Sequence, residues 1–252
     1  MKPCRLAVIG AGTIGKTHLL NALQCPQIEV VGVAESHAPA VAWVKAQGLN
    51  CVSSHLELLE RFKPDGVVIA TPNDLHASMT VEVLQAGCAA LVEKPIADTL
   101  ANARAIQAAA QQTGRPVLVG HQRRHNPIMH QAKAMVQEGR LGRPVCVTGM
   151  STWYKDEAYF EPAWRRTLVG GPVLINLIHD VDLMRFLFGE IVSVQAMVSN
   201  ATRGFEVEDT AVMTFRFANG ALGTFTLSDT AVAPWNYDLA AQETIRFPQQ
   251  EV

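Results

Sequence analysis

A glycine-rich segment near the N-terminus has the spacing of a phosphate-binding loop. The segment Gly10-Ala-Gly-Thr-Ile-Gly15 follows a short apolar run and opens a helical pattern, and a second apolar run ends at Glu35, twenty residues beyond Gly15. We expect Gly10 to permit a tight turn and Gly12 to let the backbone approach a pyrophosphate. Gly15 would then allow close packing of the helix on the strand.

The start of that helix and the acid at residue 35 complete a dinucleotide site. Backbone N–H groups at a helix N-terminus, here those of Thr13 and Ile14, attract phosphates. The carboxylate of Glu35 would accept hydrogen bonds from both hydroxyls of the adenosine ribose. A carboxylate repels a 2′-phosphate, and Ser36-His37-Ala38 brings no lysine or arginine to offset that. The pattern therefore favours NAD over NADP.

Two further polar segments follow predicted strands. Thr71-Pro-Asn-Asp-Leu-His76 comes after the apolar run 67–70, and Glu93-Lys-Pro95 comes after the run 89–92. Ligands of doubly wound sheets bind at the carboxyl ends of strands. The proline after Lys94 favours an extended backbone that would aim the lysine into the crevice. The competing interpretation is a solvated lysine at a strand end.

A third set of polar side chains interrupts an apolar helical pattern over 172–188. Asn176, His179, Asp180 and Asp182 lie there, and burying such groups without use is costly. Histidine exchanges protons near neutral pH, which suits general acid–base catalysis. The alternative is a histidine that is simply hydrogen-bonded in the core.

The first 120 residues alternate between strand and helix patterns. Apolar strand runs without polar alternation predict a parallel sheet that is buried on both faces, and hence an α/β doubly wound domain over 1–120. We expect strands at 5–9, 28–34, 66–70, 89–92 and 116–119, and helices at 14–24, 38–47, 56–62, 76–86 and 98–112. Asp98 is the expected N-cap of the last of these helices.

After Gly120 the pattern changes to an α+β arrangement over 121–252. We expect helices at 127–138 and 172–188, and strands at 145–152, 192–198, 210–217 and 221–228. The dipeptide Asn219-Gly220 predicts a hairpin between the last two strands. One face of this open sheet would be available for packing.

Composition narrows the class of protein. The chain has 252 residues, 48% of them hydrophobic and 17% charged, with a formal net charge of −2. This balance argues against a nucleic-acid binder and against disorder. No apolar run approaches the roughly 18 residues of a membrane span, and Met1–Arg5 leads into a strand without a signal peptide, so we expect a cytoplasmic protein.

Cysteine and histidine spacing predicts no metal or disulfide chemistry. The five cysteines stand singly, without a C-x-x-C pair. His121 and His125 have i,i+4 spacing, but no glutamate follows His121 as in a zinc-binding helix. We therefore expect no metal site.

Taken in order from residue 5 to about 228, these motifs resemble the glucose–fructose oxidoreductase / inositol dehydrogenase / MocA (Gfo/Idh/MocA) family. The resemblance implies an N-terminal Rossmann domain and a C-terminal α+β domain whose open, mainly antiparallel sheet assembles homodimers or homotetramers. It also implies hydride exchange between a nicotinamide cofactor and a secondary alcohol of a sugar, cyclitol or polyhydroxy acid. The matching segments are Gly10–Gly15, Thr71–His76, Glu93–Pro95, Gly120-His-Gln-Arg-Arg-His-Asn-Pro127 and Gly170-Gly-Pro-Val-Leu-Ile-Asn-Leu-Ile-His-Asp-Val-Asp182.

The same resemblance assigns roles to single residues. Lys94 matches the lysine that is hydrogen-bonded to the reacting oxygen, and His179 matches the histidine acid/base. The remaining cofactor contacts that it implies lie beneath the nicotinamide and its ribose or beside the lysine, at Thr71, Pro72, Asn73, His76 and Glu93.

One position departs from the family pattern. The family often has an aspartate three residues before the histidine, and this chain has Asn176. The amide of Asn176 can contact substrate hydroxyls but cannot act as a base. Either His179 works with Lys94 alone, or Asp180 or Asp182 supplies the carboxylate.

The substrate contacts are less constrained by the pattern. Arg123 and Arg165, with their neighbours Arg124 and Arg166, could bind the carboxylate of an acidic polyol, or could pair with acidic residues or the pyrophosphate. Tyr154 could wall a sugar ring or pack in the core. The expected substrate set is Lys94, Arg123, Tyr154, Arg165, Asn176 and His179.

Two alternatives to a dehydrogenase share the same fold. One is a non-catalytic NAD-bound sensor or regulator, and the other is a glycoside hydrolase or lyase that uses NAD for transient oxidation. Retention of both Lys94 and His179 favours the dehydrogenase over the sensor. Relatives are typically longer, and after Asp229 no clear element follows, so we expect the second domain to lack its usual C-terminal end.

Overall fold

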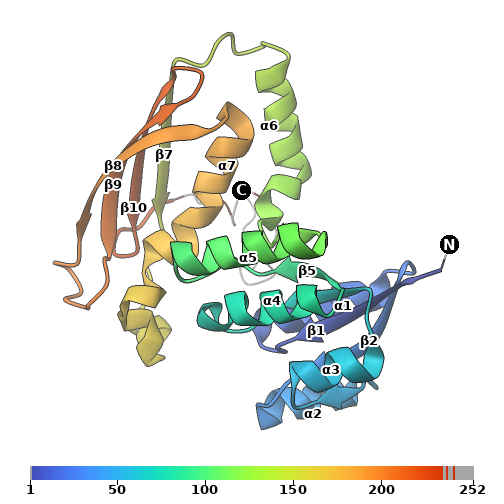
Figure 1. Ribbon diagram of the computed structural model, residues 1–252. Helices are drawn as coiled ribbons and strands as arrows, with labels where there is room; N and C mark the ends of the chain where they lie inside the picture. The colour runs from blue at the N-terminus through green and yellow to red at the C-terminus, as the bar shows by residue number, and fades with distance from the viewer. Residues whose placement is uncertain (1, 235–236, 238–240, 242–252) are drawn as a thin grey trace. The chain divides into compact units, whose positions relative to one another are not determined.

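The computed structural model describes residues 2–234, 237 and 241. The chain divides into two compact units, Met1–Gly120 and His121–Val252. The first unit is an α/β unit built on a parallel sheet, and the second is an α+β unit (Figure 1).

A six-stranded parallel sheet forms the centre of the first unit, with the strand order β3-β2-β1-β4-β5-β6. Every pairing in it is parallel, as the apolar runs predict. The strands are β1 (Cys4–Ile9), β2 (Ile28–Ala34), β3 (Cys51–Val52), β4 (Gly66–Ile69), β5 (Ala89–Val92) and β6 (Val117–Val119). The two-residue strand β3 was not among the sequence predictions.

Two apolar cores lie on the opposite faces of this sheet. Along β4, Val67 and Ile69 belong to one cluster while Val68 belongs to the other, and Val8 of β1 joins Val68. Since successive side chains of a strand point to opposite faces, both faces need apolar residues. This explains why these strands show no polar alternation.

The helices of the first unit are α1 (Thr13–Gln24), α2 (Ala38–Ala46), α3 (His55–Phe62), α4 (His76–Gln85) and α5 (Leu100–Thr113). The prediction of Asp98 as the N-cap of α5 is wrong. The cap is Thr99, whose backbone is extended and whose hydroxyl accepts from the Asn102 N–H. The Asp98 carboxylate instead accepts from the Asn102 side-chain amide at 2.7 Å. The helix begins two residues later than expected, which places Thr99 at the cap position.

The second unit contains a four-stranded mixed sheet, with the order β7-β10-β9-β8. Its strands are β7 (Cys146–Thr152), β8 (Ile191–Ser199), β9 (Thr210–Phe217) and β10 (Leu222–Ser228). The β10–β7 pair is parallel, and the β10–β9 and β8–β9 pairs are antiparallel, so the sheet is mainly antiparallel as expected. The predicted hairpin joins β9 and β10, with Gly220 at φ +89° and the Asn219 side chain accepting from Ala221.

Helices α6 (Pro127–Gln137) and α7 (Ile178–Phe188) accompany this sheet, and α7 packs against one face of it (Figure 1). Leu177 and Met184 share a cluster there with Phe215, Phe217 and Phe225. The helix predicted over 172–188 is confirmed, since all of these residues are helical, and Val173–Leu177 forms a π-helical turn before α7 begins. Short 3-10 turns over 157–170, which were not predicted, precede it.

Among the residues that the structure describes, no helix has both the length and the apolar character that crossing a membrane requires. In the same residues, no group of three or more histidine, cysteine, aspartate or glutamate side chains is arranged to hold a metal ion.

Candidate cofactor and active site

The glycine-rich loop has the geometry that its three glycines predict. Gly10 has φ +89°, and a Cβ there would lie 2.6 Å from the Ala70 carbonyl oxygen. A Cβ on Gly15 would lie 2.0 Å from the Gly10 carbonyl oxygen, so the helix start can pack only without a side chain. A Cβ on Gly12, by contrast, would meet no atom within 4 Å.

The open side of this loop can accept a dinucleotide phosphate. Gly12 is the N-cap of α1 and has no side chain to bond the first amides of the helix. Thr13 and Ile14 are exposed, whereas Gly15 is buried. Exposed amides at a helix start, approached across a glycine, suit a pyrophosphate group. The residues present therefore fit an NAD molecule.

The Glu35 carboxylate lies at the mouth of the loop. Its Oε2 accepts from the Ala11 N–H at 2.7 Å, and its Oε1 accepts from the N–H groups of Ser36 and His37, each at 2.8 Å. Burial raises the pKa of Glu35, but the hydrogen bonds from His37, Ala11 and Ser36 outweigh burial and leave the pKa below its ordinary value. The acid is thus held ionised beside the phosphate-binding turn.

Neighbouring strands bring the expected cofactor residues to one sheet edge. The register pairs Ile9 with Ala34 and with Ile69, and Ile69 with Val92, so β1, β2, β4 and β5 end side by side. The segments that follow these ends are the glycine loop, Glu35, Thr71–His76 and Glu93–Lys94. The carboxyl edge of the sheet therefore carries every predicted cofactor-binding residue.

Lys94 follows β5 in a segment whose backbone is firmly held. The Glu93 carboxylate accepts from the Lys94 N–H at 3.1 Å and contacts His18 Nε2 of α1 at 2.8 Å. Gly120 passes so close that a Cβ there would lie 2.9 Å from the Glu93 Oε1 atom. The Lys94 side chain itself is half-buried. His18 was missed by sequence reasoning, because a histidine in the middle of a helix carries no motif.

His76 connects two of the edge segments. Its ring is 1% exposed, with Nδ1 2.8 Å from the Pro95 carbonyl oxygen and Nε2 2.9 Å from the Thr71 carbonyl oxygen. A neutral imidazole has one N–H and can donate to only one of these acceptors, whereas an imidazolium donates to both. The structure gives His76 a bracing role, and its direct contact with the cofactor stays a prediction.

In the second unit, His179 lies near the start of α7 and is 5% exposed. The ring of His121 stands edge-on to it, with the centroids 6.0 Å apart. Asn176 precedes it on the π-helical turn and is half-buried. Asn176, His179, Asp180 and Asp182 thus gather in the π-helical turn and the first half of α7.

Both aspartates of this helix face arginines. Arg124 grips Asp182 through Nε, 2.8 Å from Oδ2, and through a second contact from its terminal nitrogen. Arg123 lies 3.5 Å from Asp180. The hydrogen bond that Arg124 donates to Asp182 raises the pKa of Arg124 despite partial burial. Of the alternatives open for the first two arginines, the structure favours pairing with acidic residues.

The double glycine before this helix has a packing reason. A Cβ on Gly170 would lie 2.5 Å from the Trp164 carbonyl oxygen, and one on Gly171 would lie 2.4 Å from Glu208 Oε1. The same Glu208 atom accepts from the Val173 N–H at 2.9 Å and so caps the turn that leads to His179. Sequence reasoning missed Glu208, although its place two residues before the predicted strand 210–217 was visible.

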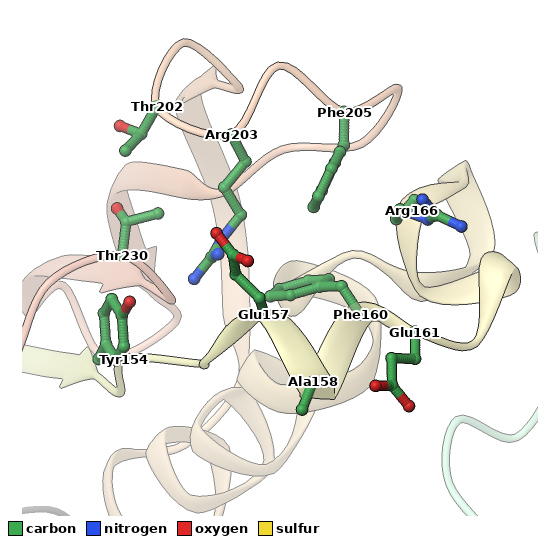
Figure 2. Close-up of a pocket in the computed structure, with 10 residues that line it drawn as sticks. All are labelled: Tyr154, Glu157, Ala158, Phe160, Glu161, Arg166, Thr202, Arg203, Phe205 and Thr230. Atoms are coloured by element: carbon green, nitrogen blue, oxygen red, sulfur yellow. The ribbon is translucent and has the colours of Figure 1, made fainter.

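The remaining substrate candidates lie in the loops of the second unit. The guanidinium of Arg165 stacks on the Tyr159 ring at 4.0 Å and donates to the Tyr159 carbonyl oxygen. Tyr154 is 52% exposed and lines a hollow of about 720 Å³. Figure 2 shows Arg203 between Tyr154 on one side and the rings of Phe160 and Phe205 on the other.

A buried charged network underlies this hollow. Arg203 donates to Asp229 Oδ1 at 2.8 Å and to the carbonyl oxygens of Lys155 and Asp229. Asp209 accepts from the N–H groups of Thr202 and Arg203. Burial raises the pKa of Asp229, and Asp209 raises it further, while Arg203 opposes both. Because Arg203 is committed to these partners, it shapes the hollow more than it offers a cation to a ligand.

Comparison with known proteins finds the same family for both halves of the chain. Residues 4–121 match "Oxidoreductase family, NAD-binding Rossmann fold", and residues 129–246 match "GFO/IDH/MocA C-terminal domain". A 1,5-anhydro-D-fructose reductase of Ensifer adhaerens is 30% identical over 88% of this chain and 68% of its own length. The scyllo-inositol 2-dehydrogenase (NAD(+)) of Bacillus subtilis is 30% identical over 94% of this chain and 70% of its own.

Solved structures agree. The WlbA dehydrogenase from Bordetella pertussis, in complex with NADH and UDP-GlcNAcA, superposes with a TM-score of 0.85 at 29% identity. That match covers 91% of this chain and 68% of the solved one. The chain thus spans about two thirds of the length of these relatives.

Proposed function

Because the chain belongs to the NAD-binding Gfo/Idh/MocA oxidoreductase family, we propose that it transfers hydride between NAD and a secondary alcohol of a small polyol. The substrate class is a sugar, a cyclitol or a polyhydroxy acid. Names of relatives point the same way, with a scyllo-inositol dehydrogenase and an anhydrofructose reductase among them. A bound nicotinamide supplies the hydride acceptor or donor.

The observation that carries this proposal is the set of residues gathered at the carboxyl edge of the parallel sheet. There the phosphate-binding turn, Glu35 and Lys94 follow the ends of neighbouring parallel strands. A lysine in such a place, with its backbone fixed by Glu93, suits a reaction at the cofactor rather than a solvated surface role. Proposed cofactor contacts at Thr71, Pro72 and Asn73 extend the same edge.

Lys94 and His179 divide the proton chemistry in this proposal. The Lys94 ammonium donates a hydrogen bond to the reacting oxygen and stabilises its developing alkoxide character. The His179 imidazole takes the hydroxyl proton during oxidation and returns it during reduction. Its 5% exposure fits a group that is kept from bulk water.

Asn176 and Asp180 have supporting roles. Asp182 pairs with Arg124, and Asp180 faces Arg123. We propose that His179 works with Lys94, and that Asn176 binds a substrate hydroxyl through its amide. Tyr154, at the edge of the hollow, would wall the substrate ring. Arg123 and Arg165 would shape the site through the partners they already hold.

Glu35 supports a preference for NAD over NADP. Its carboxylate is already held ionised by three backbone amides, so a 2′-phosphate at that place would meet a fixed negative charge. No lysine or arginine follows it in Ser36-His37-Ala38.

The outer face of the second sheet supports self-association. Val212 of β9 lies beside Met197 of β8 and Thr226 of β10. Because Val212 is an odd number of residues from Phe215, these three side chains are on the face opposite the Phe215 cluster. Exposed apolar side chains on that face are Met150, Met197, Val212 and Leu222. We propose that this face buries against a second copy in a homodimer or homotetramer. Sedimentation of the chain would test this, and a monomer at high concentration would contradict it.

The function is tested with a panel of polyols, cyclitols, sugars and hydroxy acids, each with NAD and with NADP. Reduced nicotinamide formed with at least one substrate, faster with NAD, is the expected result. Tight NAD binding without turnover on the whole panel would contradict the proposal and favour a sensor. Substrate conversion without accumulation of NADH would instead favour a hydrolase or lyase.

A further inference from the structure

Two chains of hydrogen bonds reach the backbone around Lys94. The first passes from His18 on α1 through the Glu93 carboxylate to the Lys94 N–H. The second passes from His76 at the start of α4 to the Pro95 carbonyl oxygen. The backbone of Lys94 is thus held at two points, its own N–H and the Pro95 carbonyl oxygen that follows it.

The hydrogen bonds that join His18, Glu93 and the Lys94 N–H are largely shielded from solvent. An ionised carboxylate only accepts hydrogen bonds, so the His18 ring nitrogen, 2.8 Å from Glu93 Oε1, is the donor. The side chains of His18 and Glu93 are 27% and 14% exposed. The backbone of Gly120 closes the third side of the carboxylate. These contacts hold Glu93 Oε1, and its Oε2 accepts from the Lys94 N–H at 3.1 Å.

The same series of hydrogen bonds starts at His18, on the helix proposed to bind the cofactor phosphates. Gly12 caps α1, and His18 lies on the same helix, about a turn and a half further on. A displacement of α1 would move His18, and through its contact with the Glu93 carboxylate it would shift the backbone of Lys94. His18 consequently links the phosphate-binding turn to the position of the Lys94 ammonium.

We propose that His18 is a positioning residue, which sets the place of Lys94 through Glu93. This inference rests on the proposed function, in which Lys94 contacts the reacting oxygen. A lysine that is displaced by about 1 Å loses much of its catalytic effect, because geometry can be worth about 10²-fold in rate. His18 itself touches neither cofactor phosphate nor substrate in this proposal.

The chain offers a matched control. His55 of α3 forms the same kind of pair with Glu82 of α4, and that pair does not contact Lys94. Replacing His55 removes a histidine–glutamate contact of similar chemistry from the same unit. We expect this replacement to perturb folding by a comparable amount and to leave the lysine in place.

The experiment compares His18→Ala, His18→Gln and His55→Ala with the wild-type chain. We expect His18→Ala to lower kcat about tenfold or more while KM for NAD changes less than about twofold. His18→Gln, which keeps a donor for Glu93, should recover kcat to within about threefold, and His55→Ala should leave kcat unchanged. Equal loss in His18→Ala and His55→Ala, or no loss in His18→Ala, would overturn the proposal.

A second readout needs no turnover. Acylation of Lys94 by an amine-specific reagent, measured by peptide mass spectrometry against the exposed Lys45, reports the surroundings of the ammonium. We expect the Lys94/Lys45 ratio to change several-fold in His18→Ala and to return in His18→Gln. An unchanged ratio would overturn the positioning role. If the wild-type chain has no dehydrogenase activity, the proposed function fails while this ratio still tests the link.

Should His18→Ala not fold, His18→Leu keeps the apolar bulk of the helix and receives the same measurements. The expected and contradicting results are the same.

Discussion

Strands β4 and β8 occupy opposite environments in this chain. All four residues of β4 are buried, whereas eight of the nine residues of β8 are exposed. The first sheet has an apolar core on each face, and the second has its core on the face that α7 covers. A sheet with two covered faces leaves only its carboxyl edge for ligands, and a sheet with one covered face keeps the other for packing.

A carboxylate in each unit has a shifted pKa, and the two shifts have opposite directions. Glu35 lies at the edge of the first sheet, where backbone amides lower its pKa despite burial. Asp229 lies inside the second unit, where burial and Asp209 raise its pKa against the opposing Arg203. In the proposed function the first arrangement presents a charge to the cofactor, whereas the second pairs a buried carboxylate with Arg203.

Lys94→Ala should have the largest effect. Removing the ammonium takes away the donor to the developing alkoxide, and losing one such donor lowers kcat by about 10²–10³-fold. NAD affinity, measured by calorimetry, should stay within a few-fold, because the phosphate-binding turn is intact. Lys94→Arg keeps the charge and is the matched control. A Lys94→Ala variant with undiminished turnover would refute the assigned role.

Two glycine substitutions separate packing from binding within one loop. Gly15→Ala should lower the free energy of unfolding by about 3 kcal/mol or more, because its Cβ would lie 2.0 Å from a carbonyl oxygen. Gly12→Ala meets no atom within 4 Å and should change stability by less than about 1 kcal/mol.

The same Gly12→Ala variant should bind NAD about tenfold or more weakly, because its methyl group occupies the approach of the pyrophosphate. Urea unfolding and calorimetric titration provide the two measurements. Unweakened NAD binding by Gly12→Ala would place the phosphates elsewhere.

Glu35→Ala should lower the ratio of kcat/KM with NAD to kcat/KM with NADP by about tenfold. Loss of a charged hydrogen-bond acceptor for the ribose costs about 1.5–3 kcal/mol in NAD binding, and removal of the negative charge relieves repulsion of the 2′-phosphate. The ratio of kcat/KM for the two cofactors measures this. Glu35→Asp should keep the preference for NAD. An unchanged ratio in Glu35→Ala would show that another residue selects the cofactor.

The pH dependence of stability should differ between the two carboxylates. Since folding lowers the pKa of Glu35, its stabilising contribution is present above the ordinary pKa and disappears as the pH falls through the lowered value. Glu35→Gln should therefore be less stable than wild type near neutral pH, by a few tenths of a kcal/mol at this partly exposed site, and should converge with it in acid.

Asp229 should show the reverse slope. Its raised pKa means that wild type loses stability relative to Asp229→Asn as the pH rises through the raised value. Urea unfolding at several pH values tests both variants. Slopes of the same sign would contradict the contrast between the two units.

The sequence predicted the first unit better than the second, for a physical reason. Apolar runs ending in glycine, Glu35 or Glu93-Lys94 mark strand ends directly, and parallel register places those ends together. The His18–Glu93 contact could not be read, because it joins residues 75 positions apart on a helix and after a strand.

In the second unit the important contacts depend on tertiary packing. The π-helical turn before α7 forms where Glu208, which is 35 positions away, accepts from the Val173 N–H. Nothing local in Pro172–Leu177 specifies that partner. The pairing of Asp182 with Arg124 spans 58 positions and was open in the sequence for the same reason.

Deuterium transfer is the measurement that tests the central claim most directly. The chain would be incubated with NAD and a polyol that is deuterated at its carbinol carbons, and the reduced nucleotide would be analysed by mass spectrometry. The account predicts one deuterium on the nicotinamide ring of NADH with wild type, and formation of this labelled NADH about 10²–10³-fold more slowly with Lys94→Ala. Unlabelled NADH, or labelled NADH formed equally by both proteins, would contradict it.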